Sequence, residues 1–387
     1  IKPIKMSKQK RSTADSLRLI APIMLLLYLC IGFVPNLEAV DKIAPQWLIM
    51  SALNAFSIIY FYFKRRSIAD YLHLTINNTL SLTYLTFIIW ATGSIIYAIN
   101  PTEVIVNLAR QLNVFLMFIS MTVFFFTLKN KLKLIPTIIG FILIIELYYV
   151  FDDAITMIKN AGQLNPGKLK GVAANRNITA FSIANKIPMV LLLIYLGKNI
   201  RLKVFWAFVL SLCFIALSMI QSRASFIATG LIVISYFIIN IVVYLRVRKK
   251  RTQFLELLYI LVPLILSLLI NQAVLSEKGA DVFERASTIK LNTTEGSINQ
   301  RLRYYEDVLT HMSSNPILGV GLGNWKLKSI DYDSKDIDGY IVPYHAHSDF
   351  IQLGAELGVL GFLLYLGIFI FALYYVYILI RFSDLQL

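Results

Sequence analysis

Long apolar runs with almost no charged residue are the feature that most constrains this chain of 387 residues. The segments 255–275 and 358–380, for example, are each about 20 residues long, which is the length a helix needs to cross a bilayer core of roughly 30 Å. In the whole sequence 57% of residues are hydrophobic and only 15% are charged, whereas soluble domains carry about 25% charged residues. The sequence therefore predicts an all-α polytopic membrane protein and excludes a soluble globule or a disordered chain.

Ten runs have the length and composition of transmembrane helices. They fall at residues 17–36, 46–63, 78–98, 104–127, 134–152, 177–196, 203–220, 224–245, 254–275 and 358–380. A basic start precedes the first run, and no small-residue cleavage pattern follows it. We therefore expect an uncleaved first span and not a removed signal peptide.

Basic residues alternate between the two sides predicted for these spans. Counting from a cytoplasmic N-terminus, the short outer connections hold only Lys42 and Arg223. The basic residues of the inner loops lie at 64–66, 129–133, 198–203, 246–251 and 381. This pattern obeys the positive-inside rule and predicts cytoplasmic N- and C-termini. It also accounts for the net charge of +15, so no nucleic-acid partner is expected.

Two predicted outer segments, 153–176 and 276–349, are too long to be simple connectors. The second holds eleven of the 22 acidic residues and three of the four histidines. Long loops without regular structure are uncommon and usually functional. We therefore divide the chain into transmembrane helices 1–9 (1–275), a large periplasmic catalytic loop (276–349), and an interfacial helix with the last span (350–387).

The densest motif is the sequence PYHAHSDFIQLGAELGVLG, which begins at residue 343. Asp349 and Gln352 have the spacing of a capping box that opens a short helix. Asp349, Gln352 and Glu356 would then share one helix face. His347 precedes this helix, whose positive end would keep the imidazole neutral, as a general base requires. The alternative is a histidine that only caps the helix.

An arginine at residue 223 lies in the sequence QSRAS, between the seventh and eighth predicted spans. It has no acidic neighbour in the sequence, and an arginine of this kind can hold a phosphate group through two hydrogen bonds. The alternative is an interfacial arginine whose charged end reaches the aqueous boundary.

Residues 299–309 predict an amphipathic helix inside the long outer loop. Arg301 and Arg303 would either face an anionic ligand or pair with acidic residues of the same helix. The apolar side of this helix is predicted to carry Leu302, Tyr305 and Leu309.

Two charged residues fall inside predicted spans. Arg110 lies near the outer end of the fourth span, and Lys186 lies on the order of 12 Å into the sixth. Intramembrane charges are costly, so they usually mark a functional or bundle-interior position. Both could bind an anion at the outer face, or either could pair with a buried carboxylate such as Glu146. His345 and His347 are too few for a zinc site, and no metal site is expected.

Taken in order, these motifs resemble those of the O-antigen ligases and Wzy-type polymerases. The resemblance covers roughly residues 220–365 and is carried by the Ser-Arg-Ala motif, an Arg-x-x-x-Tyr-Glu helix, the sequence NPILGVGLGN at 315–324, and His-Ser-Asp…Glu-Leu-Gly. Ser348 stands where this family usually has asparagine after the histidine.

The resemblance implies a bacterial inner-membrane glycosyltransferase with a GT-C-like helical fold. Such an enzyme moves a glycan from undecaprenyl pyrophosphate to a lipid A–core acceptor sugar in the periplasm, without metal or cofactor, while lipid-facing helices accommodate the polyprenyl chain. His347 would be the general base, and Arg223 and Arg301 would bind the donor pyrophosphate. Further substrate contacts are expected from Arg303, Arg110, Lys186, His345 and Glu356.

Three other functions compete with a ligase. A Wzy-type polymerase uses the same donor chemistry but transfers to another lipid-linked sugar, so product length separates the two. A transporter of lipid-linked oligosaccharides would show internal pseudo-symmetry and helices broken near the midplane, which the sequence does not indicate. Bilayer-embedded peptidoglycan polymerases have a similar helical build, but the His347 motif argues against them.

Overall fold

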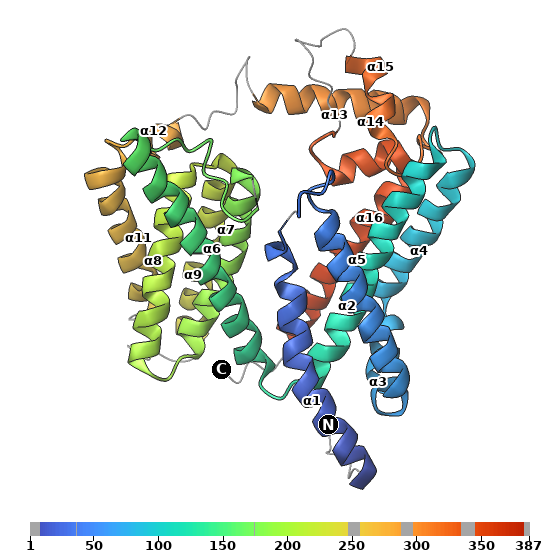
Figure 1. Ribbon diagram of the computed structural model, residues 1–387, viewed down its shortest axis with the longest axis horizontal. Coiled ribbons are helices and arrows are strands. Elements are labelled where there is room, and N and C mark those ends of the chain that lie inside the picture. Colours follow the sequence, from blue (N-terminus) through green and yellow to red (C-terminus); the bar gives the residue numbers. More distant parts are fainter. Residues whose placement is uncertain are drawn as a thin grey trace. The chain divides into compact units, whose positions relative to one another are not determined.

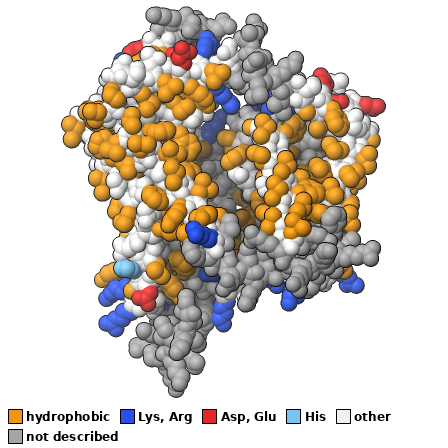
Figure 2. All heavy atoms as spheres, turned by 180° about the vertical axis from the view of Figure 1, so that it is seen from behind, with side chains coloured by type: hydrophobic (Ala, Val, Ile, Leu, Met, Phe, Trp, Pro, Cys, Tyr) orange, Lys and Arg blue, Asp and Glu red, His pale blue; other side chains and the backbone are white. Residues whose placement is uncertain are grey.

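The computed structural model describes residues 8–35, 37–173, 175–246, 256–287, 297–333 and 345–382. Within these ranges the regular elements are helices, and no strand occurs (Figure 1). Nine helices among them are long and apolar enough to cross a membrane. Figure 2 shows apolar side chains spread over the visible face. The predicted all-α polytopic membrane fold is thus confirmed.

Nine of the ten predicted spans coincide with these nine helices. The exception is the first, predicted at 17–36, because α1 (Lys8–Leu29) has an apolar helical part of only Leu19–Leu29 among the residues searched. Two predicted loops are partly helical. The helix α3 (Arg65–Ile76) replaces an inner loop, and α6 (Lys131–Ala161) continues past residue 152 until Gly162, in the left-handed conformation, ends it.

The chain folds as two compact units. Unit 1 comprises residues 1–28, 36–127 and 292–387, and unit 2 comprises 29–35 and 128–291. The three-part functional division predicted from the sequence stays a prediction. The predicted basic segment at 247–251 and the parts 288–296 and 334–344 of the outer loop lie outside the described residues.

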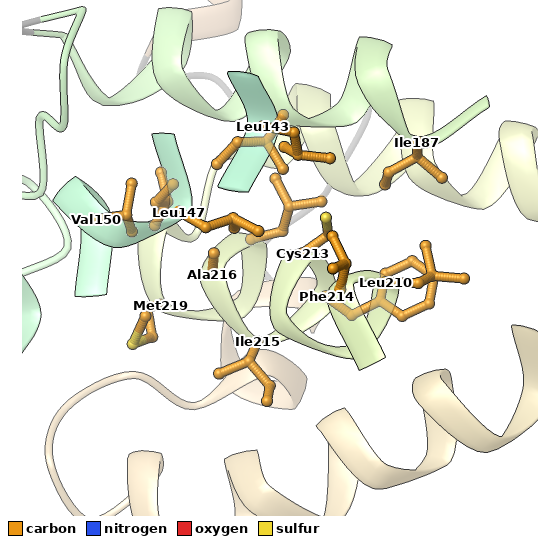
Figure 3. Packing of buried hydrophobic residues seen from close by; sticks show 14 of the residues in the cluster. Leu143, Leu147, Val150, Ile187, Leu210, Cys213, Phe214, Ile215, Ala216 and Met219 are labelled. Atoms are coloured by element: carbon orange, nitrogen blue, oxygen red, sulfur yellow. The ribbon is translucent and has the colours of Figure 1, made fainter. Parts of the chain in front are cut away.

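Unit 2 is a helical bundle built around α8 (Ile200–Ile220), which packs against α6, α7 (Arg176–Leu196) and α11 (Leu258–Ile270). Its core includes Leu143, Ile187 and Cys213, all of which are buried (Figure 3). Since lipid tails are as apolar as leucine, such a bundle is held mainly by close packing and not by removal of apolar surface from water. The bundle also contains α9 (Arg223–Arg246), followed in the outer segment by the short α12 (Val282–Ser287).

Unit 1 contains α1, α2 (Ala44–Phe63), α3, α4 (Thr79–Gly93) and α5 (Pro101–Thr127). From the far end of the chain it adds α13 (Ser297–Ser314), the short α14 (Trp325–Lys328) and α15 (Ile330–Asp333), and α16 (Asp349–Phe382). Its core joins the two parts of the chain, because Phe87 of α4 and Leu108 of α5 pack in one cluster with Leu353 and Leu357 of α16.

The helix α16 is broken at Gly358, which has φ 69° and ψ −176°. A break of this kind removes hydrogen-bond donors from backbone carbonyls, and a buried carbonyl needs a replacement. Val320 N–H donates to the Ala355 carbonyl at 3.0 Å, and Gly321 N–H donates to that of Glu356 at 2.8 Å. The Trp90 indole donates to the Leu357 carbonyl at 2.9 Å. A loop and a neighbouring helix therefore supply the hydrogen-bond donors for the carbonyl groups of the broken turn.

The loop that crosses the break holds the closely spaced glycines of the 315–324 motif. A Cβ atom at Gly319 would overlap the backbone of α16, and one at Gly323 would overlap the Asn107 side chain of α5. The buried Asn324 fastens the end of this loop, since its side chain accepts from Asn100 N–H at 2.7 Å and donates to the Asn100 carbonyl at 3.2 Å. The glycines are thus explained by close backbone packing and do not form a nucleotide-binding loop.

We expect Gly358→Ala to lower the thermal unfolding midpoint in detergent by several degrees. Alanine would have to adopt a left-handed conformation, and its methyl group would overlap the Ile317 carbonyl, which together cost about 2–4 kcal/mol. The control is Gly93→Ala, because a Cβ atom there meets no atom within 4 Å. Equal midpoints for the two variants would contradict this account of the break.

Candidate active site

His347 lies in the short segment that leads into α16. Its backbone has φ 58°, a left-handed conformation that few residues other than glycine adopt. The imidazole stacks on the Tyr304 ring of α13 with 5.8 Å between ring centroids and remains exposed. Strained conformations of this kind concentrate at functional sites. The stack holds the ring while one side stays accessible.

The pKa of the His347 imidazole is lowered below its usual value. Partial burial of the ring is the largest cause, followed by the positive charges of Arg301 and then His345. Each of these disfavours the imidazolium form. His347 is therefore neutral, and able to accept a proton, at neutral pH.

Gln352 and Glu356 form the support beneath this segment. Gln352 Oε1 accepts from the Ala346 N–H at 3.1 Å, and Gln352 Nε2 donates to Glu356 Oε1 at 3.0 Å. Glu356 is only 2% exposed, and its Oε2 accepts from the Gly323 N–H at 2.7 Å. Gln352 thus reaches back as a capping box predicts, although it reaches Ala346 and not the residue that opens the helix.

The helix predicted at 299–309 exists as α13, but its buried face was predicted wrongly. Leu302 and Leu309 are 56% and 57% exposed, whereas Tyr304, Val308 and His311 are buried against the rest of unit 1. Arg301 and Arg303 are both exposed on this helix. Among the described residues, neither arginine forms an ion pair with Glu306 of the same helix.

Sequence reasoning missed the buried environment of His311, a residue near the end of α13. His311 is 3% exposed, its Nδ1 lies 3.0 Å from the Tyr332 hydroxyl, and its ring lies against Trp325. Its Nε2 has no hydrogen-bond partner among the described residues. Burial first, and then the charge of Lys328, lower the pKa of His311. A single histidine on an amphipathic helix gave no signal for this aromatic environment.

A polar cavity of about 470 Å³ lies in unit 1, between the first turns of α5, the glycine loop and the first turns of α16. Of the predicted substrate-binding residues, Arg110, His345 and Glu356 line it. Asp349 and Gln352 line it as well, so the predicted shared face of Asp349, Gln352 and Glu356 points into one cavity. His347 does not line it.

Arg110 and Lys186 each have an acidic partner. Arg110 Nη2 lies 3.0 Å from Asp41 Oδ2 in unit 1. In unit 2, Lys186 Nζ lies 2.9 Å from Glu146 Oε1 and 3.0 Å from Oε2, with both side chains largely buried. The structure thus shows the pairing with Glu146 that the sequence left open. Such a pair offsets the cost of a charge within the membrane span.

Arg223 is the first residue of α9 and lies in a group of arginines in unit 2. Arg285 of α12 donates through Nε to the carbonyl of Gln221 at 3.0 Å. Gln221 lies two residues before Arg223, where α9 begins. The pKa of Arg285 is lowered, first by burial and then by the positive charges of Arg223 and Arg176. Arg176, the first residue of α7, thus belongs to the same group. Sequence reasoning missed Arg176 and Arg285 because only the folded chain brings these positions together.

The predicted site residues divide between the two units. Unit 1 holds the catalytic candidates His347 and Arg301 and the predicted contacts Arg303, Arg110, His345 and Glu356. Unit 2 holds Arg223 and Lys186. Unit 1 therefore holds the exposed His347, the exposed arginines of α13 and the polar cavity.

These features define a multi-pass helical membrane protein that concentrates polar and basic groups at the ends of its helices. Residues 206–366 match the model of the O-antigen ligase family. The family resemblance predicted from the motifs is confirmed.

Two curated proteins, from Rickettsia typhi and Rickettsia prowazekii, are similar to this chain, and both carry the name "putative polysaccharide ligase". The first is 26% identical over 292 residues, which is 73% of this chain and 65% of that protein. The second is 25% identical over 294 residues with the same two coverages. This chain therefore spans about 65% of the length of these relatives.

We expect Glu146→Gln to destabilise the protein by about 3–5 kcal/mol, because it leaves Lys186 buried without its partner. The double variant Glu146→Gln/Lys186→Met removes both charges and should recover most of this loss. Thermal unfolding in detergent measures both effects, with the single variant Lys186→Met as the matched comparison. A double variant no more stable than Glu146→Gln would show that the two side chains are not energetically coupled.

Proposed function

We propose that this protein is an O-antigen ligase-like glycosyltransferase, which moves a glycan from undecaprenyl pyrophosphate to a lipid A–core acceptor sugar. The observation that carries the proposal is that His347 stacks on Tyr304 of α13 and lies within the electrostatic influence of Arg301, inside the range that matches the O-antigen ligase family. The alternation of basic loops supports an inner-membrane location with cytoplasmic termini and a periplasmic site.

His347 is the general base in this proposal. The acceptor hydroxyl loses its proton to the imidazole as its oxygen attacks the anomeric carbon of the donor sugar. The bond from this carbon to the phosphate oxygen breaks, and undecaprenyl pyrophosphate leaves with the electron pair. A histidine whose pKa is lowered by burial and by nearby positive charge suits this task, because it is unprotonated at neutral pH and can accept the proton.

The arginines bind the leaving pyrophosphate. Negative charge grows on its oxygens as the bond breaks, and cations fixed in advance lower the barrier to this step. Arg301 and Arg303 of α13 supply this charge from unit 1. The family motif also assigns Arg223 to the pyrophosphate, and Arg223 lies near Arg176 and Arg285 in unit 2. No metal or cofactor has a role in the proposed reaction.

A Wzy-type polymerase is the second candidate. It shares the donor chemistry, and the motifs of this chain resemble those of ligases and of Wzy-type polymerases alike. A transporter is favoured less. The break in α16 at Gly358 lies near the first residues of that helix and not in its middle, unlike the midplane breaks of transporters.

The direct test compares the wild type with His347→Ala, using a lipid-linked oligosaccharide donor, candidate acceptors and EDTA. We expect the variant to lose at least about a hundredfold in rate, since general base catalysis contributes about 10²–10⁴-fold. Release of undecaprenyl pyrophosphate and product size are measured together. A single transfer indicates a ligase and a ladder of lengths indicates a polymerase. Full activity in His347→Ala would refute the base assignment, and loss of wild-type turnover in EDTA would refute a metal-free reaction.

The pH dependence of kcat/KM tests the environment of His347. Because the pKa of His347 is lowered, activity should fall only below about pH 6.5, the ordinary histidine value. Arg301→Gln removes a positive charge that disfavours the imidazolium, so the acidic limb should move to higher pH even though the rate falls. Arg303→Gln, on the same helix, is the control and should move the limb less. If the acidic limb of the pH profile stayed in place in Arg301→Gln, Arg301 would not influence the pKa of His347.

A further inference from the structure

The polar cavity of unit 1 has no role in the proposed mechanism, since neither His347 nor Arg301 lines it. We propose that it binds the acceptor sugar, and that it selects a neutral or amino sugar over one that carries a carboxylate. This inference rests on the proposed function and adds a substrate class to it.

The size and lining of the cavity fit a saccharide. Its volume of about 470 Å³ lies within the roughly 300–1,000 Å³ of small-molecule sites. The side-chain amides of Asn107, Gln111 and Gln352 line it beside the carboxyl groups of Asp349 and Glu356. Amides donate and accept hydrogen bonds, whereas ionised carboxylates only accept them. Such a lining suits a ligand rich in hydroxyl or amino donors.

The charges that line the cavity determine which sugar fits. Both of its strong cations already have acidic partners, because Arg110 pairs with Asp41 at 3.0 Å and Lys326 pairs with Glu103 at 2.8 Å. Among the residues that the structure describes, Asp349 and Glu356 form no ion pair with lysine or arginine. The positive charge of Lys326 reaches Glu356, so Asp349 is the acidic group that would oppose a sugar carboxylate in the cavity, at a cost in affinity. A hydroxyl or ammonium group would meet acceptors.

The position of the cavity indicates the acceptor and not the pyrophosphate end of the donor. His345 forms part of its wall, and His347, the proposed base for the acceptor hydroxyl, follows two residues later. The arginines assigned to the pyrophosphate, Arg301 and Arg223, do not line it. A sugar in the cavity would thus lie beside the segment that carries the proposed base.

The test measures saccharide binding to the purified full chain in detergent without any donor. The probes are methyl glycosides in matched neutral, 2-amino and uronic acid forms, in gluco and galacto configurations, observed by saturation-transfer NMR and titration. We expect a neutral or amino glycoside to bind at least about tenfold more tightly than its uronic acid counterpart. Equal or tighter binding of the uronic acids, or no binding of any probe, would overturn the proposal.

Asp349→Asn locates the binding, because Asp349 is exposed at the first turn of α16 and its replacement leaves the internal hydrogen bonds of Glu356 intact. This variant should reduce the discrimination against uronic acids by about threefold or more, and Glu356→Gln should act in the same direction if it folds. Glu306→Gln, exposed on α13 and outside the cavity, is the matched control and should bind like the wild type. Unchanged discrimination in Asp349→Asn would overturn the assignment.

Two further readouts separate this inference from the proposed function. His347→Ala should lose transfer and keep saccharide binding, and Asp349→Asn should raise the KM for the acceptor while leaving the KM for the donor unchanged. A raised donor KM would assign the cavity to the donor glycan and overturn the acceptor role. Cavity-dependent saccharide binding without any transfer by the wild type would mean that the proposed reaction is wrong although the cavity binds sugar.

Discussion

The break of α16 at Gly358 is the constraint on which the arrangement of unit 1 depends. Three carbonyl groups, of residues 355–357, take their hydrogen bonds from the glycine loop and from Trp90 instead of from the helix itself. Because buried carbonyls must be satisfied, the loop can occupy only one position across the helix. That position also places the Gly323 N–H on Glu356 and Asn324 on the connection between α4 and α5. The cavity wall therefore follows from one broken helical turn.

Charged groups are treated differently in the two parts of this molecule. Inside the bundle of unit 2, Lys186 is held by both carboxylate oxygens of Glu146. In the same unit, Arg223 lies near Arg176 and Arg285, and burial, followed by the positive charges of Arg223 and Arg176, lowers the pKa of Arg285. Grouped positive charge of this kind is costly in an isolated protein and becomes favourable when an anion arrives. The Lys186–Glu146 pair thus contributes to the fold of the bundle, whereas the arginines are the charges that we propose to bind an anion.

The sequence predicted the spans well because the hydrocarbon thickness fixes their length, and nine of ten were found. It also predicted that Asp349, Gln352 and Glu356 share one helix face, because helix spacing is local. It failed where burial depends on partners. On α13, hydrophobicity favoured Leu302 and Leu309, but the packed face uses Tyr304 and His311. The Tyr304 hydroxyl contacts Gln300, and His311 Nδ1 contacts the Tyr332 hydroxyl. The arginine group could not be predicted, since its members come from three separate helices.

The division of unit 1 along the chain has a consequence for its biosynthesis. The core that joins α4 and α5 to α16 needs residues at both ends of the chain, and nearly all of unit 2 lies between them. Ribosomes add about 5–20 residues per second, so roughly 10–40 s separate the synthesis of α5 from that of α16. During this interval α4 and α5 lie in the membrane with the surface that α16 will cover still open to lipid or to other helices. The nascent chain is therefore most exposed to misassembly while unit 2 is being completed.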